Sequence, residues 1–257
     1  MKTTLAITLL PALVSTTLLQ GAIVLENASI ANDFDGGTSG TVSFAQSAAG
    51  DATYLFAVYG ENLASASAPS VIYDDGGTNQ SATLEEFASV SGSTYAAVFS
   101  LELGSVSAGT IDITFDNNST TKNMFDIYQL SGASGASLLS DSVASPGDAS
   151  VAVAFSSVPA ADSFALFVAA EYGNSGTLDA PTGGTSPTVT LNDSGSYLVG
   201  SLYDLADATQ AYSWGRDKTN DMAGAAIAVS VPEPSTCAAL FGIGALGIVL
   251  WRRRRAA

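Results

Sequence analysis

Carboxylates are the residues of this sequence that could do chemistry, because it contains no histidine and only one cysteine. Without histidine, Ser-His-Asp and Cys-His catalysis, a histidine acid-base and His-ligated zinc are all excluded. The single cysteine, Cys237, cannot form an intramolecular disulfide. The absence of histidine therefore excludes more reaction classes than any motif suggests.

Glycoside hydrolysis is one reaction that carboxylates alone can catalyse, with two of them about 5 to 10 Å apart in a cleft. The glutamates available for such a pair are Glu61, Glu85, Glu86, Glu102 and Glu171. Residues 22–231 carry 23 of the 24 acidic residues, so chance alone places some of them close together. We therefore assign no catalytic residues and expect no enzyme.

Two aspartate-rich segments have the composition of oxygen-ligand cation sites. Asp33 and Asp35 stand just before a Gly-Gly pair, and Asp74 and Asp75 stand just before another. These four carboxylates are calcium candidates, although neither segment matches an EF-hand loop and Asp-Gly clusters are more often plain turns. The expectation is that the protein has no metal site and needs no cofactor, with calcium as the alternative.

The charge of residues 22–231 limits the partners of this segment. Lys122, Arg216 and Lys218 are its only basic residues, against 23 acidic ones. Such a field repels nucleic acid and anionic headgroups and keeps a domain soluble. We expect no nucleic-acid partner.

Short β-branched and aromatic runs separated by turn residues fill the chain between its two ends, which predicts an all-β fold. The predicted strands are 41–45, 53–59, 70–73, 95–103, 109–115, 124–130, 150–155, 163–170, 188–191, 196–204 and 223–231. Turns are expected between them, for example at Ser145-Pro146-Gly147. This number of strands suits one jelly-roll-like double-sheet sandwich over residues 23–230, with two tandem sandwiches as the alternative. The likeness of the segment Tyr54–Asn62 to Phe164–Asn174 favours duplication only weakly, since two strands of one jelly roll would look the same.

The first 22 residues have the pattern of a secretory signal peptide. Lys2 precedes an apolar run from Leu5 to Leu19, and the small residues Gly21 and Ala22 follow. This pattern predicts export through the Sec translocon and cleavage by signal peptidase near residue 22.

A sorting segment is predicted at residues 231–257. It begins with Val231, Pro232, Glu233, Pro234, Ser235 and Thr236. An apolar stretch at 237–251 follows and ends in Trp251, and the basic residues Arg252, Arg253, Arg254 and Arg255 come next. As a helix, 15 apolar residues cover about 22 Å, less than the ~30 Å of a bilayer core. Trp251 and the four arginines are typical of the cytoplasmic end of a transmembrane helix, which places residues 23–230 outside the inner membrane.

The order and spacing of this tail resemble the PEP-CTERM sorting signal of Gram-negative bacteria. The same kind of tail is also described as the C-terminal domain of ice-binding proteins. The resemblance implies that exosortase, a membrane-embedded cysteine protease, recognises Pro232, Glu233 and Pro234 and cleaves nearby. Two prolines hold this segment extended, as a protease groove requires. The order of strands also loosely resembles secreted bacterial β-sandwich modules.

These features predict an exported protein that is held in the inner membrane before processing and then reaches the cell surface or the extracellular matrix. We expect no catalytic activity of its own, and extracellular polysaccharide is a candidate partner. The alternatives are a carbohydrate-binding or adhesive module and, less favoured, a glycoside hydrolase or an ice-binding protein. The sequence contains no Thr-x-Thr repeat at the fixed spacing that an ice-binding face would need.

Overall fold

The computed structural model describes residues 23–35, 39–61, 67–116, 122–160, 163–172, 179, 181–183, 188–193, 197–205 and 209–230. The described residues form strands and no helix, which confirms the all-β class. They therefore include no helix that could cross a membrane. The predicted signal peptide, the sorting segment and the helix at 237–251 lie outside the described residues, so the predicted domain boundaries stay predictions.

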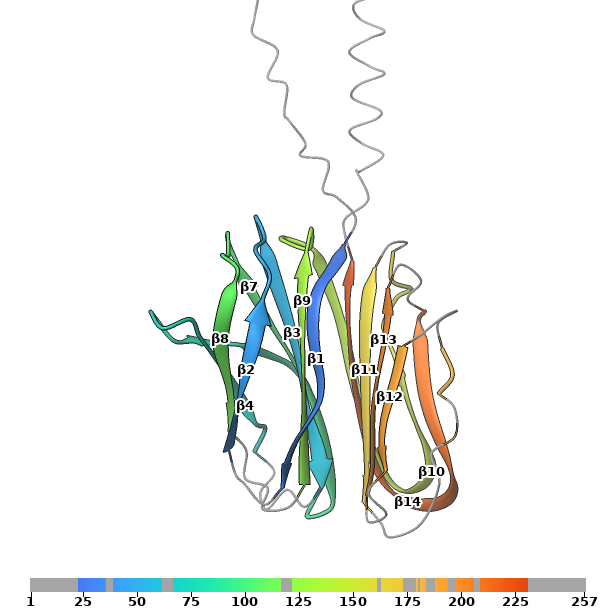
Figure 1. Cartoon of the computed structure of the whole chain (residues 1–257). Helices are drawn as coiled ribbons and strands as arrows, with labels where there is room; N and C mark the ends of the chain where they lie inside the picture. Colours follow the sequence, from blue (N-terminus) through green and yellow to red (C-terminus); the bar gives the residue numbers. More distant parts are fainter. Residues whose placement is uncertain are drawn as a thin grey trace, which may run out of the picture. The chain divides into compact units, whose positions relative to one another are not determined.

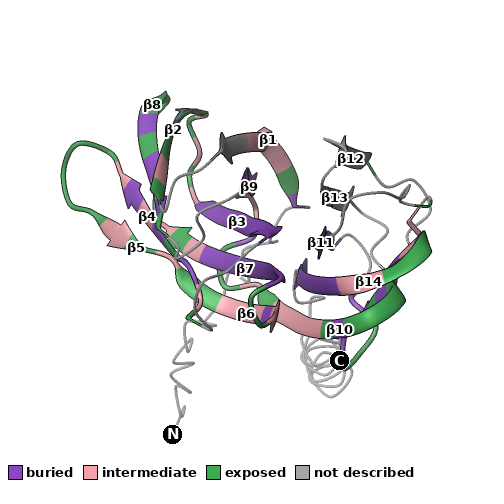
Figure 2. Cartoon of the chain, turned by 90° about the horizontal axis from the view of Figure 1, so that it is seen from below, coloured by how far each residue is buried: buried purple, intermediate pink, exposed green. Residues whose placement is uncertain are grey.

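The central sheet contains five antiparallel strands (Figure 1), and its three middle strands are buried on both faces (Figure 2). Its order is β1 (Val24–Asp35), β9 (Lys122–Ser131), β3 (Ala52–Glu61), β7 (Thr94–Leu103) and β6 (Thr83–Val90). All ten residues of β3 are buried, because Leu55 and Ala57 face one neighbouring sheet while Tyr54 and Phe56 face the other. A nearly continuous apolar run is typical of a strand covered on both sides.

The outer sheet covers one face of the central sheet. Its order is β2 (Ser39–Gln46), β8 (Gly109–Asp116), β4 (Ser70–Asp74) and β5 (Gln80–Ser81). On β8, Ile111, Ile113 and Phe115 are buried against the central sheet, whereas Asp112 is exposed. This alternation is the one the sequence predicts, and it produces an aromatic-rich core between the two sheets.

The C-terminal sheet covers the opposite face of the central sheet. Its order is β10 (Ser137–Ala154), β14 (Ala211–Ser230), β11 (Phe164–Tyr172), β13 (Tyr197–Leu205) and β12 (Thr188–Asp193). The second core lies between the two five-stranded sheets and includes Leu166 and Val168 of β11. Antiparallel sheets packed face to face confirm the predicted sandwich, and the third sheet is present because the central sheet presents two apolar faces.

The long strands β10 and β14 bend back over the outer side of the C-terminal sheet (Figure 1). A third core forms there, in which Val151 and Val153 of β10 and Trp214 of β14 pack with Phe167 of β11. The prediction that a turn at 145–147 separates two strands is wrong, because β10 runs through these residues. The strand continues through it with shifts in register, and Gly147 takes a φ of 70°.

The central and C-terminal sheets repeat one topology. Numbered in chain order within each sheet, β1-β9-β3-β7-β6 and β10-β14-β11-β13-β12 both have the order first, fifth, second, fourth, third. The equivalence extends to the outer sheet. The pairing of β2 with β8 corresponds to that of residues 150–154 with 211–215, and the pairing of β4 with β8 corresponds to the bridge between Thr182 and Ser213.

The two repeats pack through their five-stranded sheets as the subunits of a two-fold dimer would. The first strand of each sheet lies against the third strand of the other, since β1 contacts β12 and β10 contacts β6. This reciprocal contact is the property of an isologous interface. Both repeats belong to one compact unit spanning residues 21–233.

Candidate functional site

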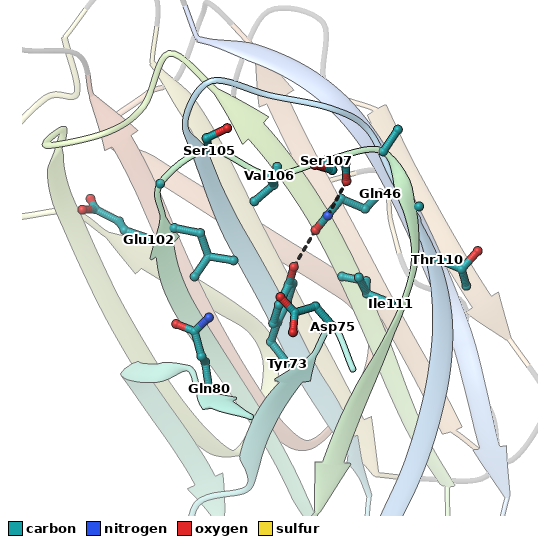
Figure 3. A pocket seen from close by; sticks show the side chains of 14 residues that line it. Gln46, Tyr73, Asp75, Gln80, Glu102, Ser105, Val106, Ser107, Thr110 and Ile111 are labelled. Atoms are coloured by element: carbon teal, nitrogen blue, oxygen red, sulfur yellow. Dashed lines mark hydrogen bonds between the residues drawn. The ribbon is translucent and has the colours of Figure 1, made fainter. Parts of the chain in front are cut away.

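A polar pocket of about 560 Å³ lies in the first repeat, at one end of the outer sheet (Figure 3). Its walls come from the ends of β2, β4 and β7, from β5, from the start of β8 and from the loop between β7 and β8. Two backbone hydrogen bonds between Ala49 and Val106, of 2.9 and 3.0 Å, hold this loop. The volume is within the range of small-molecule sites.

Gln46 anchors the inner side of the pocket. It follows Val42 and Phe44 on the inward face of β2, where only 8% of its surface is exposed. Its amide oxygen accepts hydrogen bonds from the hydroxyls of Tyr54 and Tyr73, the latter at 2.7 Å, and its amide nitrogen donates to the carbonyl of Ser107 at 2.7 Å. A buried amide needs such partners, so this network fixes both the tyrosines and the loop.

The two tyrosine hydroxyls are held in the protonated form. Burial is the main cause that raises the pKa of Tyr54, and its interaction with Tyr73 adds to it. Burial also raises the pKa of Tyr73, and the negative charge of Asp75 contributes in the same direction. Both hydroxyls therefore remain hydrogen-bond donors to Gln46 at neutral pH.

The outer side of the pocket carries polar side chains that are open to solvent. Asp75 and Glu102 are exposed, and Gln80 is half-buried. In Figure 3 the Asp75 side chain lies beside Tyr73, and Gln80 and Glu102 lie together on the other side of the pocket. Leu103, Val106 and Ile111 add apolar surface to the lining. The arrangement offers hydrogen-bond donors and acceptors together with apolar patches.

The calcium candidates are distributed over two sheets. Asp33 and Asp35 lie at the end of β1, and their side chains lie outside the described residues. Asp74 is the last residue of β4 and Asp75 follows it, and each carboxylate accepts a hydrogen bond from the backbone N–H two residues ahead, at 2.7 and 3.0 Å. In the described part of the chain, no group of three or more His, Cys, Asp or Glu side chains could hold a metal. The local hydrogen bonds are those of plain turns.

The glutamates considered for hydrolysis do not share the pocket, which Glu102 alone of the five lines. Glu85 and Glu86 accept hydrogen bonds from serines, Glu85 from Ser100 and Glu86 from Ser140 and Ser142. Glu61 is buried at the end of β3, and Glu171 is fully buried on β11. Asp75 is the other carboxylate of the pocket, and the sequence singled it out for calcium only.

Sequence reasoning missed most of the pocket, because Gln46, Tyr73 and Gln80 carry no motif. One signal was available: the alternation Val42, Phe44, Gln46 places an amide at a core-facing position of a strand. A polar residue at such a position must find partners inside the fold.

The predicted sorting residues 231–236 and the anchor residues 251–255 lie outside the described residues. Both fall within residues 230–255, which match the family model of the PEP-CTERM protein-sorting motif. The motif marks the chain as a secreted protein that is directed to exosortase, which confirms the resemblance noted in the sequence. The comparisons with curated proteins and with solved structures find no match.

Proposed function

We propose that this protein is a non-catalytic component of the cell surface or extracellular matrix, delivered there when exosortase cleaves its tail. The PEP-CTERM motif at residues 230–255 is the observation that carries this proposal. The short predicted helix at 237–251 suits a temporary anchor better than a permanent one. After cleavage the product would be an acidic β-sandwich protein.

The non-catalytic role is supported by the chemistry of the chain. There is no histidine to serve as a general base or a nucleophile activator. Several described carboxylates outside the pocket are engaged in structure, such as Glu86 with two serines and Glu171 with Arg216. A rigid, strongly acidic sandwich is suited to remain soluble and hydrated within an extracellular matrix.

The sorting step is tested by replacing Pro232, Glu233 and Pro234 with alanine in a host that contains exosortase. The intact mass of the recovered protein should show loss of the tail in the wild type and its retention in the variant. The variant should therefore be found in the membrane fraction, because it keeps the predicted helix at 237–251. A matched control is Ser156→Ala with Ser157→Ala, two exposed positions in the β-sandwich, which should be processed normally. Equal processing of the wild type and the triple variant would refute the proposal.

A further inference from the structure

We infer that the polar pocket of the first repeat binds an uncharged, hydroxyl-rich ligand, namely a sugar unit of a neutral polysaccharide. The inference deepens the proposed function by naming what the exported protein would hold, and it rests on that proposal only in expecting the ligand outside the cell. The pocket itself is defined by residues between Gln46 and Ile111.

The first argument is the match between lining and ligand. A sugar presents hydroxyls that both donate and accept, and C–H faces that pack on apolar surface. The carboxylates of Asp75 and Glu102 accept hydrogen bonds, and the amide of Gln80 both donates and accepts. Leu103, Val106 and Ile111 provide apolar contact beside them. Each class of sugar surface therefore has a counterpart in the pocket.

The second argument weighs against three other classes of ligand: anions, metal ions and apolar molecules. An anion would meet two carboxylates in the pocket and a strongly acidic surface around it. A metal ion would find two carboxylates in the pocket, and the described residues contain no group of three or more His, Cys, Asp or Glu side chains that could hold one. An apolar ligand would leave the polar groups of the pocket without partners.

The third argument comes from the second repeat, which has the same strands but not the same polar group at this place. Gln46 comes two residues after Phe44, which pairs with Ile111, the first inward residue of β8. In the second repeat the equivalent pair is Val153 with Tyr212, and the residue two positions after Val153 is Phe155. Phe155 is apolar and only 2% exposed. An apolar residue is therefore compatible with this fold, and the amide network is a feature of the first repeat only. Folding alone does not require it.

The test measures retention of the full chain, in mild detergent, on immobilised neutral polysaccharides: dextran, mannan, cellulose and starch. Polygalacturonate serves as the anionic counterpart. At least one neutral polymer should retain the protein, and polygalacturonate should not. The double variant Gln80→Ala/Glu102→Ala removes two solvent-accessible pocket groups and should weaken binding to the retaining polymer about tenfold or more. The matched control Asp148→Ala removes an exposed carboxylate from the second repeat and should bind as the wild type does.

Three results would overturn the inference. They are no retention on any neutral polymer, equal retention of the wild type and the double variant, and retention that disappears with a chelator and returns with calcium. Unfolding curves of both variants should match that of the wild type, because neither changes a core residue. Normal tail processing in the host that contains exosortase, together with no retention, refutes the pocket alone. Retention together with an unprocessed tail in that host refutes the sorting proposal alone.

Discussion

Removing Arg216 should destabilise the protein strongly, because this guanidinium neutralises a carboxylate inside the second repeat. Arg216 of β14 forms an ion pair with Glu171 of β11, and both side chains are fully buried. Asn220 adds a hydrogen bond of 2.8 Å to the same carboxylate. Burial lowers the pKa of Arg216, while the neighbouring Asp217 opposes this shift. The pair therefore has a large desolvation cost that its mutual attraction must offset.

The expected magnitude follows from which partner remains. Arg216→Met leaves the Glu171 carboxylate buried without its cation, which costs about 3–5 kcal/mol in the free energy of unfolding. Total stabilities are only about 5–15 kcal/mol, so this loss is a large fraction. The double variant Glu171→Met/Arg216→Met removes both charges, and such replacements range from neutral to about 1–4 kcal/mol stabilising. The double variant should thus be more stable than the single one.

Denaturant unfolding at pH 7 measures these free energies for the wild type and the two variants. Lys218→Met is the matched control, since it removes a basic residue that is exposed on the same strand and should change stability by less than about 0.5 kcal/mol. A loss below about 1 kcal/mol for Arg216→Met would refute the reasoning. So would a double variant that is as unstable as the single one.

Two further predictions concern the tyrosine network and the core of the second repeat. Because burial raises the folded-state pKa of Tyr54 and Tyr73 above the ordinary tyrosine value of about 10, their contribution to stability is complete below about pH 10. It is lost as the pH rises further, by up to about 1.4 kcal/mol per pH unit and tyrosine. Denaturant titrations at alkaline pH should show this decline, and phenolate absorbance should show at least two tyrosines that do not ionise near pH 10 while the protein is folded. Ionisation of all tyrosines near pH 10 in the folded protein would contradict the prediction. Gly224→Ala should cost about 1–3 kcal/mol, because its Cβ would lie 2.9 Å from Val151 Cγ2 and 3.1 Å from Phe167 Cε2. Gly50→Ala, with no atom within 4 Å of the added carbon, is the control, and equal stability of the two variants would refute the packing argument.

The strands that sequence reasoning found are those with strong apolar character. All eleven predicted segments overlap observed strands, and the match is closest where a strand is central, as in β3 and β7. The missed strands β1, β5 and β6 lie on or next to sheet edges. In β6 the residues Glu85 and Glu86 interrupt the apolar pattern, and most of its side chains are only partly buried. Pairing with β7, a tertiary contact, stabilises this strand despite its composition.

The extent of β10 and β14 was also beyond local reasoning. The segment before Val151 contains serines, a proline and a glycine, which is the composition of a turn. It remains a strand because residues 137–145 pair with residues 222–230 of β14, far along the chain. The long-range hydrogen bonds between β10 and β14 thus override the local preference, and the turn residues produce only a bend in the strand.

The shared strand order supports the duplication better than the sequence likeness between Tyr54–Asn62 and Phe164–Asn174 does. That likeness aligns Glu61 with Glu171, yet the two lie on opposite faces of their strands. Glu61 lies on the same face of β3 as Leu55 and Ala57, which pack against the other five-stranded sheet. Glu171 lies on the same face of β11 as Phe167, which packs into the third core. Side chains alternate between the two faces of a strand, so a shift of one residue would move every buried side chain to the other face. The aligned glutamates are therefore not structurally equivalent. Strand order is therefore what the two repeats share, and each could acquire its own buried polar group: an amide beside an open pocket in the first, and a closed ion pair in the second.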